Sequence, residues 1–236
     1  KNDEPLDFYA VTDHGFFMGM MQAYADPSGK MSNYEFTKAF HNLNDPENIT
    51  VESAGQRSNI FSSILAAAII DPYPLWHPKV IKAYFNNHTQ FALRAFDDRI
   101  HKSAWADVAR AAEEHNDPGT FTTFLGYEYT TSSDVEGGNL HRNVIFNSSK
   151  GPIRPWTRID SINPEDLWTW QDNLRAKGVD SVAIPHNSNG SNGQMFEVES
   201  FYGEALDREY AEKRMRNEPI VEITQVKGTS DTHPLL

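Results

Sequence analysis

The sequence predicts an α/β protein whose strands alternate with helices and end at a common edge. Three observations indicate this fold. An apolar opening strand stops abruptly at Asp13 and His14, later strand-like runs are separated by helix patterns, and polar residues follow each run. In such folds the carboxyl ends of parallel strands meet at one face, where functional sites form. The sequence therefore predicts a site at the strand ends.

The composition is that of a folded, acidic chain. With 236 residues, of which 39% are hydrophobic, the chain is long enough for one large domain or two small ones. The net charge of −12 would repel a nucleic-acid backbone, and the longest apolar run, Ile64–Ile70, is far below the roughly 20 residues of a membrane span. We therefore expect neither nucleic acid nor a membrane as partner. The absence of cysteine excludes thiolate ligands and a cysteine nucleophile, which leaves His, Asp, Glu or water for any metal.

The first half of the chain predicts one strand followed by a helical block. Residues 6–12 are predicted to form a strand buried on both faces, as in a central parallel strand, and no regular element is predicted over 16–59. Helices are predicted over 60–70, 78–99 and 103–115. We expect this block, about residues 17–119, to be a helical insertion within a single domain of residues 1–236.

The second half predicts alternating strands and helices. Strands are predicted over 120–129 and 143–146, and if they pair as a hairpin, Glu128 and His141 become neighbours. The following elements are a helix from Asn163-Pro164 to Gly178, a strand over 181–185, a helix over 204–216 and a strand over 220–224.

Five strand ends carry residues of the kinds that bind metals. They are Asp13-His14, Glu128, His141, His186 and the pair Asp231 and His233. Oxygen and imidazole donors without thiolate favour Zn, Mn, Fe or Mg in an open catalytic site, where a cation lowers the pKa of water. The alternative is a set of polar loop caps, because polar residues commonly follow strands. For Asp13 three roles stay open: direct ligand, orientation of His14, or handling of the proton of the water.

Five segments together resemble the PHP (polymerase and histidinol phosphatase) superfamily. They are DFYAVTDHG, FLGYEYT, NLHRNVIF, IPHNSNGS and VEITQVKGTSDTHPLL, and the likeness is closest to a PHP-like family labelled a domain of unknown function. The resemblance implies a distorted (β/α)7 TIM-like barrel that binds two or three divalent metal ions and hydrolyses a small-molecule substrate, usually a phosphate ester.

The resemblance also implies residue roles. His14, Glu128, His141 and His186 match metal ligands, and Asp13 matches the acid beside the second-motif histidine. Asp13 and Glu128 are the predicted catalytic residues. The first motif, His-x-His, would precede Lys1, and the final Asp-x-His motif usually comes later than the segment here. The barrel is therefore expected to be incomplete at both ends, which leaves Asp231 and His233 as uncertain ligands.

Two cations near the predicted site are candidates for binding substrate. Arg142 follows His141, and Lys227 follows the last strand, although each is equally well explained as a surface charge. Two alternatives to a phosphoesterase stay open: a hydrolase of amides or lactones resembling the amidohydrolases, and a barrel that binds metal or glycan without turnover. Metal analysis and a panel of substrates would separate them.

Overall fold

The computed structural model describes residues 6–42, 45–46, 49–51, 55, 59, 96–133, 138–148, 150–226 and 228–229. The helix predicted over 60–70, most of that over 78–99, and Lys227, Asp231 and His233 lie outside these residues. The chain divides into two compact units, one formed by residues 1–16 with 106–236 and the other by residues 17–105. No helix in the described part of the chain is long and apolar enough to cross a membrane.

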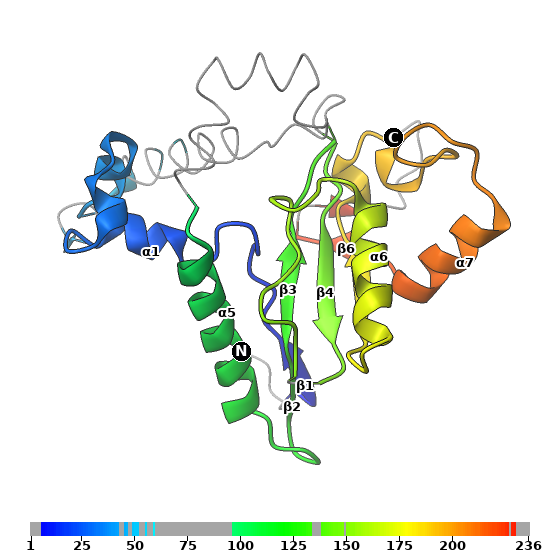
Figure 1. The fold of residues 1–236 in the computed structure, drawn as a ribbon, viewed down its shortest axis with the longest axis horizontal. Helices are drawn as coiled ribbons and strands as arrows, with labels where there is room; N and C mark the ends of the chain where they lie inside the picture. The colour runs from blue at the N-terminus through cyan, green and yellow to red at the C-terminus, as the bar shows by residue number, and fades with distance from the viewer. Residues whose placement is uncertain are drawn as a thin grey trace. The chain divides into compact units, whose positions relative to one another are not determined.

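The first unit contains the sheets (Figure 1). Its strands are β1 (Phe8–Ala10), β2 (Thr122–Phe124), β3 (Gly126–Tyr129), β4 (Arg142–Phe146), β5 (Ser181–Pro185), β6 (Thr224–Gln225) and β7 (Gly228–Thr229). Its helices are α6 (Pro164–Arg175), α7 (Arg208–Asn217) and the later part of α5 (Asp98–Glu114), with 3-10 turns at Ser188–Gly190 and Gln194–Phe196.

The strands form three small sheets. The first sheet is the parallel pair β1 and β2. The second is antiparallel and contains β3, β4 and β5 in that order. The third is a short hairpin of β6 and β7. The chain after β1 continues alongside β3, because the Glu128 N–H donates to the Asp13 carbonyl (2.8 Å) and the Gly15 N–H donates to the Glu128 carbonyl (2.9 Å). The segment that carries His14 is thereby fixed to β3 through the backbone.

The predicted TIM-like barrel is wrong. The described strands form sheets of two or three strands, and no barrel is closed among these residues. A barrel of this kind needs parallel strands, whereas β4 is antiparallel to both of its neighbours. The connection from β3 to β4 covers residues 130–141, and no helix lies in its described part, so the chain reverses as the predicted hairpin rather than as a βα crossover.

The segment between β4 and α6, residues 147–163, explains why β4 and β5 are antiparallel although helix α6 lies between them in the sequence. Side-chain hydroxyls at every second residue from β3 onward donate to its carbonyls. The bonds are Tyr127 to Trp156 (2.7 Å), Tyr129 to Ser161 (2.7 Å) and Thr131 to Ile162 (3.0 Å). This segment carries the chain back along the sheet before α6 begins, so β5 starts beside the end of β4. The sequence predicts no regular element in this segment.

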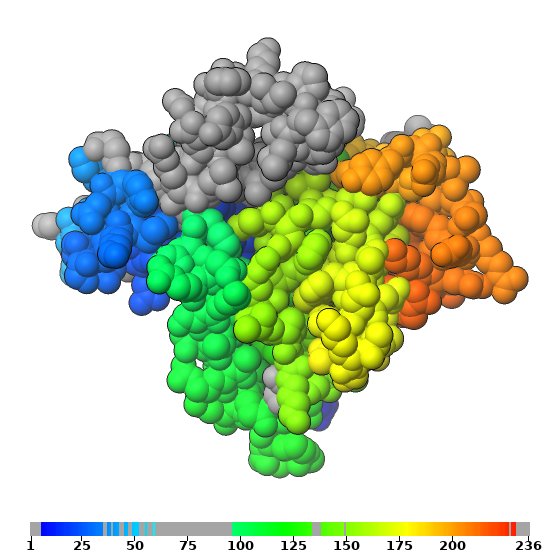
Figure 2. Space-filling model, in the orientation of Figure 1, coloured from blue at the N-terminus to red at the C-terminus, as the bar shows by residue number. Residues whose placement is uncertain are grey.

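Helix α6 begins where the sequence predicts and covers one face of the antiparallel sheet. The Asn163 side chain accepts a hydrogen bond from the Glu165 N–H (2.8 Å), with Pro164 in the first turn. The buried residues Val144 and Phe146 of β4 point to this face, and the Phe146 ring contacts Trp170 of α6. In Figure 2 the atoms of α6 and of α7 lie side by side, as the contacts between the two helices also indicate.

Strand β1 is not the buried central strand that was expected. Phe8 is 65% exposed, and Leu6, Tyr9 and Val11 are also exposed. The apolar pattern identified a strand correctly, but β1 pairs with only β2 among the described strands and so lies at the margin of the first unit. The strand predicted over 220–224 also differs, because only Thr224 is in a strand and Ile220, Val221 and Ile223 are exposed.

The second unit is helical in its described part. It contains α1 (Met20–Ala25), 3-10 helices at Lys30–Asn33 and Glu35–Phe40, and the beginning of α5. None of the first three was predicted, which is expected because short helices have little periodicity. Helix α5 begins five residues before the predicted start, where the Asp97 carboxylate accepts a hydrogen bond from the Arg99 N–H (2.9 Å).

Candidate metal centre

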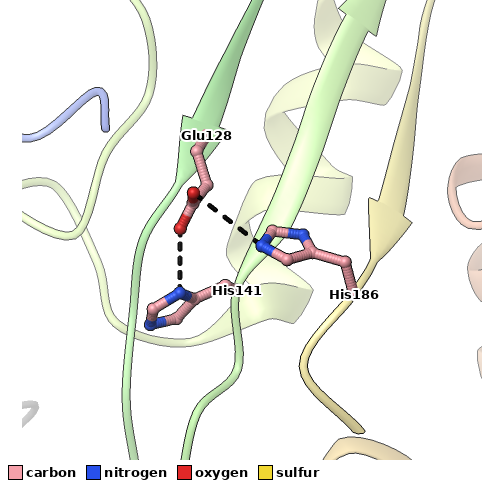
Figure 3. A group of neighbouring side chains, drawn as sticks. All are labelled: Glu128, His141 and His186. Carbon is pink, nitrogen blue, oxygen red and sulfur yellow. Dashed lines mark ion pairs between the residues drawn. The ribbon is translucent and has the colours of Figure 1, made fainter. Parts of the chain in front are cut away.

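The antiparallel register brings three of the predicted ligands together on one face of the sheet. Glu128 lies near the end of β3, His141 directly precedes β4, and His186 directly follows β5. Because side chains alternate along a strand and β4 runs opposite to its neighbours, these positions share both an edge and a face. Figure 3 shows the carboxylate of Glu128 directed toward both imidazoles.

The donor atoms of this trio lie close enough to bind one cation. One donor atom from each of Glu128, His141 and His186 lies within 4.8 Å of the others. The His141 Nδ1 atom is 2.8 Å from Glu128 Oε1, and the His186 Nε2 atom is 3.8 Å from Glu128 Oε2. The His186 Nδ1 atom lies 3.4 Å from the Ile184 carbonyl. If Nδ1 carries the proton, the lone pair of Nε2 is available for a cation on the side of Glu128.

His14 lies on the solvent side of the same carboxylate. Its Nδ1 atom is 3.3 Å from Glu128 Oε1 and 2.7 Å from the Thr130 hydroxyl, and its side chain is 48% exposed. His14 is outside the group of donors within 4.8 Å, as is Asp13, which is exposed and meets Glu128 through its backbone carbonyl. The structure therefore places His14 beside the trio and does not bring the Asp13 carboxylate into it.

The Glu128 carboxylate is held in its ionised form. Burial alone would raise the pKa of Glu128, but the hydrogen bonds and charges of His14 and His141 outweigh it, so the pKa lies well below its usual range. The Thr130 hydroxyl also donates to Glu128 Oε1 (3.0 Å). A divalent cation would require this ionised carboxylate together with neutral imidazoles, so its binding would displace the protons of the histidines that bind it.

Two loops that carry the histidines are joined at Gly138. A Cβ atom at Gly138 would lie 2.6 Å from the Ser191 carbonyl oxygen, so only glycine allows this approach. Next to it, the Asn139 N–H donates to the Gly190 carbonyl (3.0 Å). These contacts show how the loop after His186 is supported.

Arg142 is directed away from the trio. It lies on the opposite face of β4, where its guanidinium donates to Glu218 Oε1 (2.7 Å) and both side chains are 2% exposed. Arg142 lines a cavity of about 140 Å³ beside α6 and α7. Alternation along β4 explains the difference, because successive residues point to opposite faces and His141 takes the face of Glu128. The predicted role of Arg142 in binding substrate therefore has no support from its position.

Two residues that support the trio, Thr130 and Gln225, were not predicted from the sequence. Thr130 contacts both Glu128 and His14, and it could have been found because it lies two residues after Glu128 and so shares its face. Gln225 donates through Nε2 to the His186 carbonyl and to Asn187 Oδ1 (3.3 Å). No local pattern identifies Gln225, since it reaches His186 only through the fold.

Comparison with known proteins identifies the family but not the chemistry. The family model described as "Protein of unknown function (DUF3604)" matches residues 1–236. No model of the PHP superfamily matches, so the expected membership of that superfamily is wrong. Neither the curated proteins nor the solved structures give a match. Because the matching model spans the whole sequence, the chain belongs to the DUF3604 family.

Proposed function

We propose that this protein is a metal-dependent hydrolase of phosphate esters. The observation that carries the proposal is the trio Glu128, His141 and His186, whose donor atoms lie within 4.8 Å of one another. Two imidazoles and one carboxylate suit Zn, Mn or Fe, and three protein ligands leave positions open for water and substrate. A bound divalent cation would supply Lewis acidity, which lowers the pKa of water and polarises a phosphoryl oxygen.

The residues around the trio have distinct proposed tasks. Glu128, His141 and His186 hold the cation, and Thr130 keeps the Glu128 carboxylate in place. His14 lies at the solvent side, where its imidazole either completes the ligand set or accepts the proton of the attacking water. A catalytic role for the exposed Asp13 stays a prediction, because only its backbone carbonyl contacts Glu128. The expectation of two or three cations stays a prediction.

Metal analysis and a substrate panel test the proposal. The purified protein should contain a divalent metal by mass spectrometry, and it should hydrolyse a generic phosphoester in a chelator-sensitive reaction. His186→Ala should lower metal content and turnover together. His115→Ala is the matched control, because His115 directly follows α5, is exposed and has its Nδ1 atom 2.9 Å from the Ala111 carbonyl of that helix.

The other outcomes assign the site to a different class. Chelator-sensitive hydrolysis of amides or lactones, without action on phosphoesters, would place the protein among hydrolases of those substrates. Bound metal without any hydrolysis would indicate a binding module. Metal content unchanged in His186→Ala would remove this residue from the ligands and contradict the proposal.

A further inference from the structure

Arg158 is a buried cation without a counter-ion. Its side chain is only 4% exposed, and its Nε atom is buried without a hydrogen-bond partner. Among the described residues none forms a hydrogen bond or an ion pair with the Arg158 guanidinium. Buried charges in proteins are normally paired, because removing an isolated ion from water is costly. Burial accordingly lowers the pKa of Arg158, although the group stays charged at neutral pH.

The local sequence does not supply a partner for Arg158. The acid closest to it is Asp160, whose carboxylate is already occupied by Arg154, with one bond of 2.8 Å from Nη1 and a second from Nη2. The same carboxylate accepts the Thr157 N–H (2.9 Å). These bonds fix the turn that carries Arg158 while leaving its guanidinium unneutralised.

The Phe16 ring lies near both Arg158 and His14 of the candidate metal centre. Its Cζ atom lies 5.9 Å from the centre of the Phe16 ring, and the Phe16 ring lies 6.0 Å from the His14 ring. The preceding residue, Thr157, lies against Gly15, where a Cβ atom would be 3.3 Å from its methyl group. The turn with Arg158 therefore packs against the segment that follows His14.

We propose that Arg158 binds an oxyanion of the substrate beside Phe16, at the turn that packs against the segment following His14. A guanidinium held by a rigid turn offers two parallel N–H donors to a phosphate or carboxylate, and a low-dielectric setting strengthens that contact. The identification of this oxyanion as the phosphate of an ester rests on the proposed function. Binding of an oxyanion does not, because it requires no metal and no turnover.

Inorganic phosphate is the probe for this inference. In chelator-treated protein, phosphate should raise the melting temperature of the wild type and of Glu128→Gln, and it should leave that of Arg158→Met unchanged. By calorimetry, phosphate should bind Arg158→Met roughly tenfold to a hundredfold more weakly, the range for a charge-assisted hydrogen bond. Arg158→Lys should keep part of the affinity. Arg99→Met is the matched control, because Arg99 is exposed and paired with Asp97.

A purely structural role for Arg158 predicts different results. Without phosphate, Arg158→Met should melt at the same temperature as the wild type or higher, because it removes an unpaired buried charge. A marked fall in melting temperature with phosphate binding retained would overturn the proposal, as would absence of phosphate binding in the wild type. If Arg158-dependent binding is found but no ester is hydrolysed, the proposed function fails and the oxyanion site stands.

The active protein gives a second measurement. Arg158→Met should raise KM for p-nitrophenyl phosphate more than it lowers kcat, whereas Arg99→Met should leave both unchanged. A fall in kcat at unchanged KM in Arg158→Met would contradict recognition of the phosphate by Arg158.

Discussion

The length of the Glu128 side chain determines whether the trio can form. Glu128 and His186 lie at the ends of β3 and β5, which are separated by β4. Neighbouring strands are about 4.8 Å apart, so the two backbones are separated by about 10 Å. The Glu128 carboxylate crosses most of this distance and lies 3.8 Å from His186 Nε2 while also contacting His141. The charge of the carboxylate is therefore necessary but not sufficient.

We expect Glu128→Asp to lose metal almost as completely as Glu128→Gln. The shorter side chain keeps the charge but withdraws the carboxylate from His186, so metal affinity should fall by more than about 100-fold, beyond the usual effect of changing an outer-shell residue. Titration with Zn or Mn followed by calorimetry would measure this. Glu212→Asp, in an exposed pair with Arg208, should leave metal binding unchanged. Full affinity in Glu128→Asp would show that His186 is not a ligand.

At the scale of elements, one buried carboxylate connects β4 with the two helices that cover it. Glu218, which directly follows α7, accepts hydrogen bonds from Arg142 of β4 (2.7 Å) and from Trp168 Nε1 of α6 (2.8 Å). Its second oxygen accepts a bond from Arg214 of α7 (3.2 Å). Because Arg142 is fully buried, Glu218 is the group that neutralises it.

Glu218→Gln should destabilise the protein strongly. Removal of one partner from a buried ion pair leaves an uncompensated charge, which typically costs about 3–5 kcal/mol. Chemical denaturation would measure the loss in the free energy of unfolding. Glu212→Gln on α7 is the matched control, and it should change stability by less than about 1 kcal/mol because its pair with Arg208 is exposed. Similar stability of the two variants would contradict the role of Glu218.

The helices and strands show which parts of the fold were predictable from the sequence. The start of α6 was predicted from Asn163 and Pro164, because a cap is a local interaction, and the hairpin that joins Glu128 to His141 was predicted from two strand patterns and a short connection. The barrel was not predictable in this way. Alternation of strands and helices does not fix strand direction, which here depends on the extended segment before α6 and its contacts with β3.

For the candidate site, the sequence predicts the residues at the strand ends, and the alternation of side chains along paired strands determines which of them share a face. The register of the paired strands places Glu128, His141 and His186 on one face, and alternation along β4 removes Arg142 from that face. No sequence pattern indicates that Arg158 lacks a hydrogen-bond partner for its Nε atom, because this depends on which residues surround it in the folded chain. Metal ligation by the trio stays a prediction.

At the scale of the whole molecule, large apolar side chains are exposed around β1 and in the segment after α7 of the first unit. The exposed side chains are Leu6, Phe8, Tyr9 and Val11 around β1 and Ile220, Val221, Ile223 and Val226 after α7. Exposed apolar strands with unpaired edges favour association with other chains.

We therefore expect Phe8→Lys to reduce self-association. A charge on an exposed edge strand opposes pairing with another strand, so light scattering at increasing protein concentration should rise less than in the wild type. Ile153→Lys is the matched control: Ile153 is 80% exposed but lies in a loop, so its replacement should have a smaller effect. Equal effects would indicate that total surface hydrophobicity, and not the strand edge, controls association.

The close approach at Gly138 has a consequence for how the two histidine loops can move. The Gly138 backbone lies against the Ser191 carbonyl, and Asn139 is bonded to Gly190, so neither loop can swing outward alone. Shifts caused by a ligand would carry both loops together and preserve the separation of His141 and His186. Opening this side of the molecule would first require rupture of these contacts between the loops.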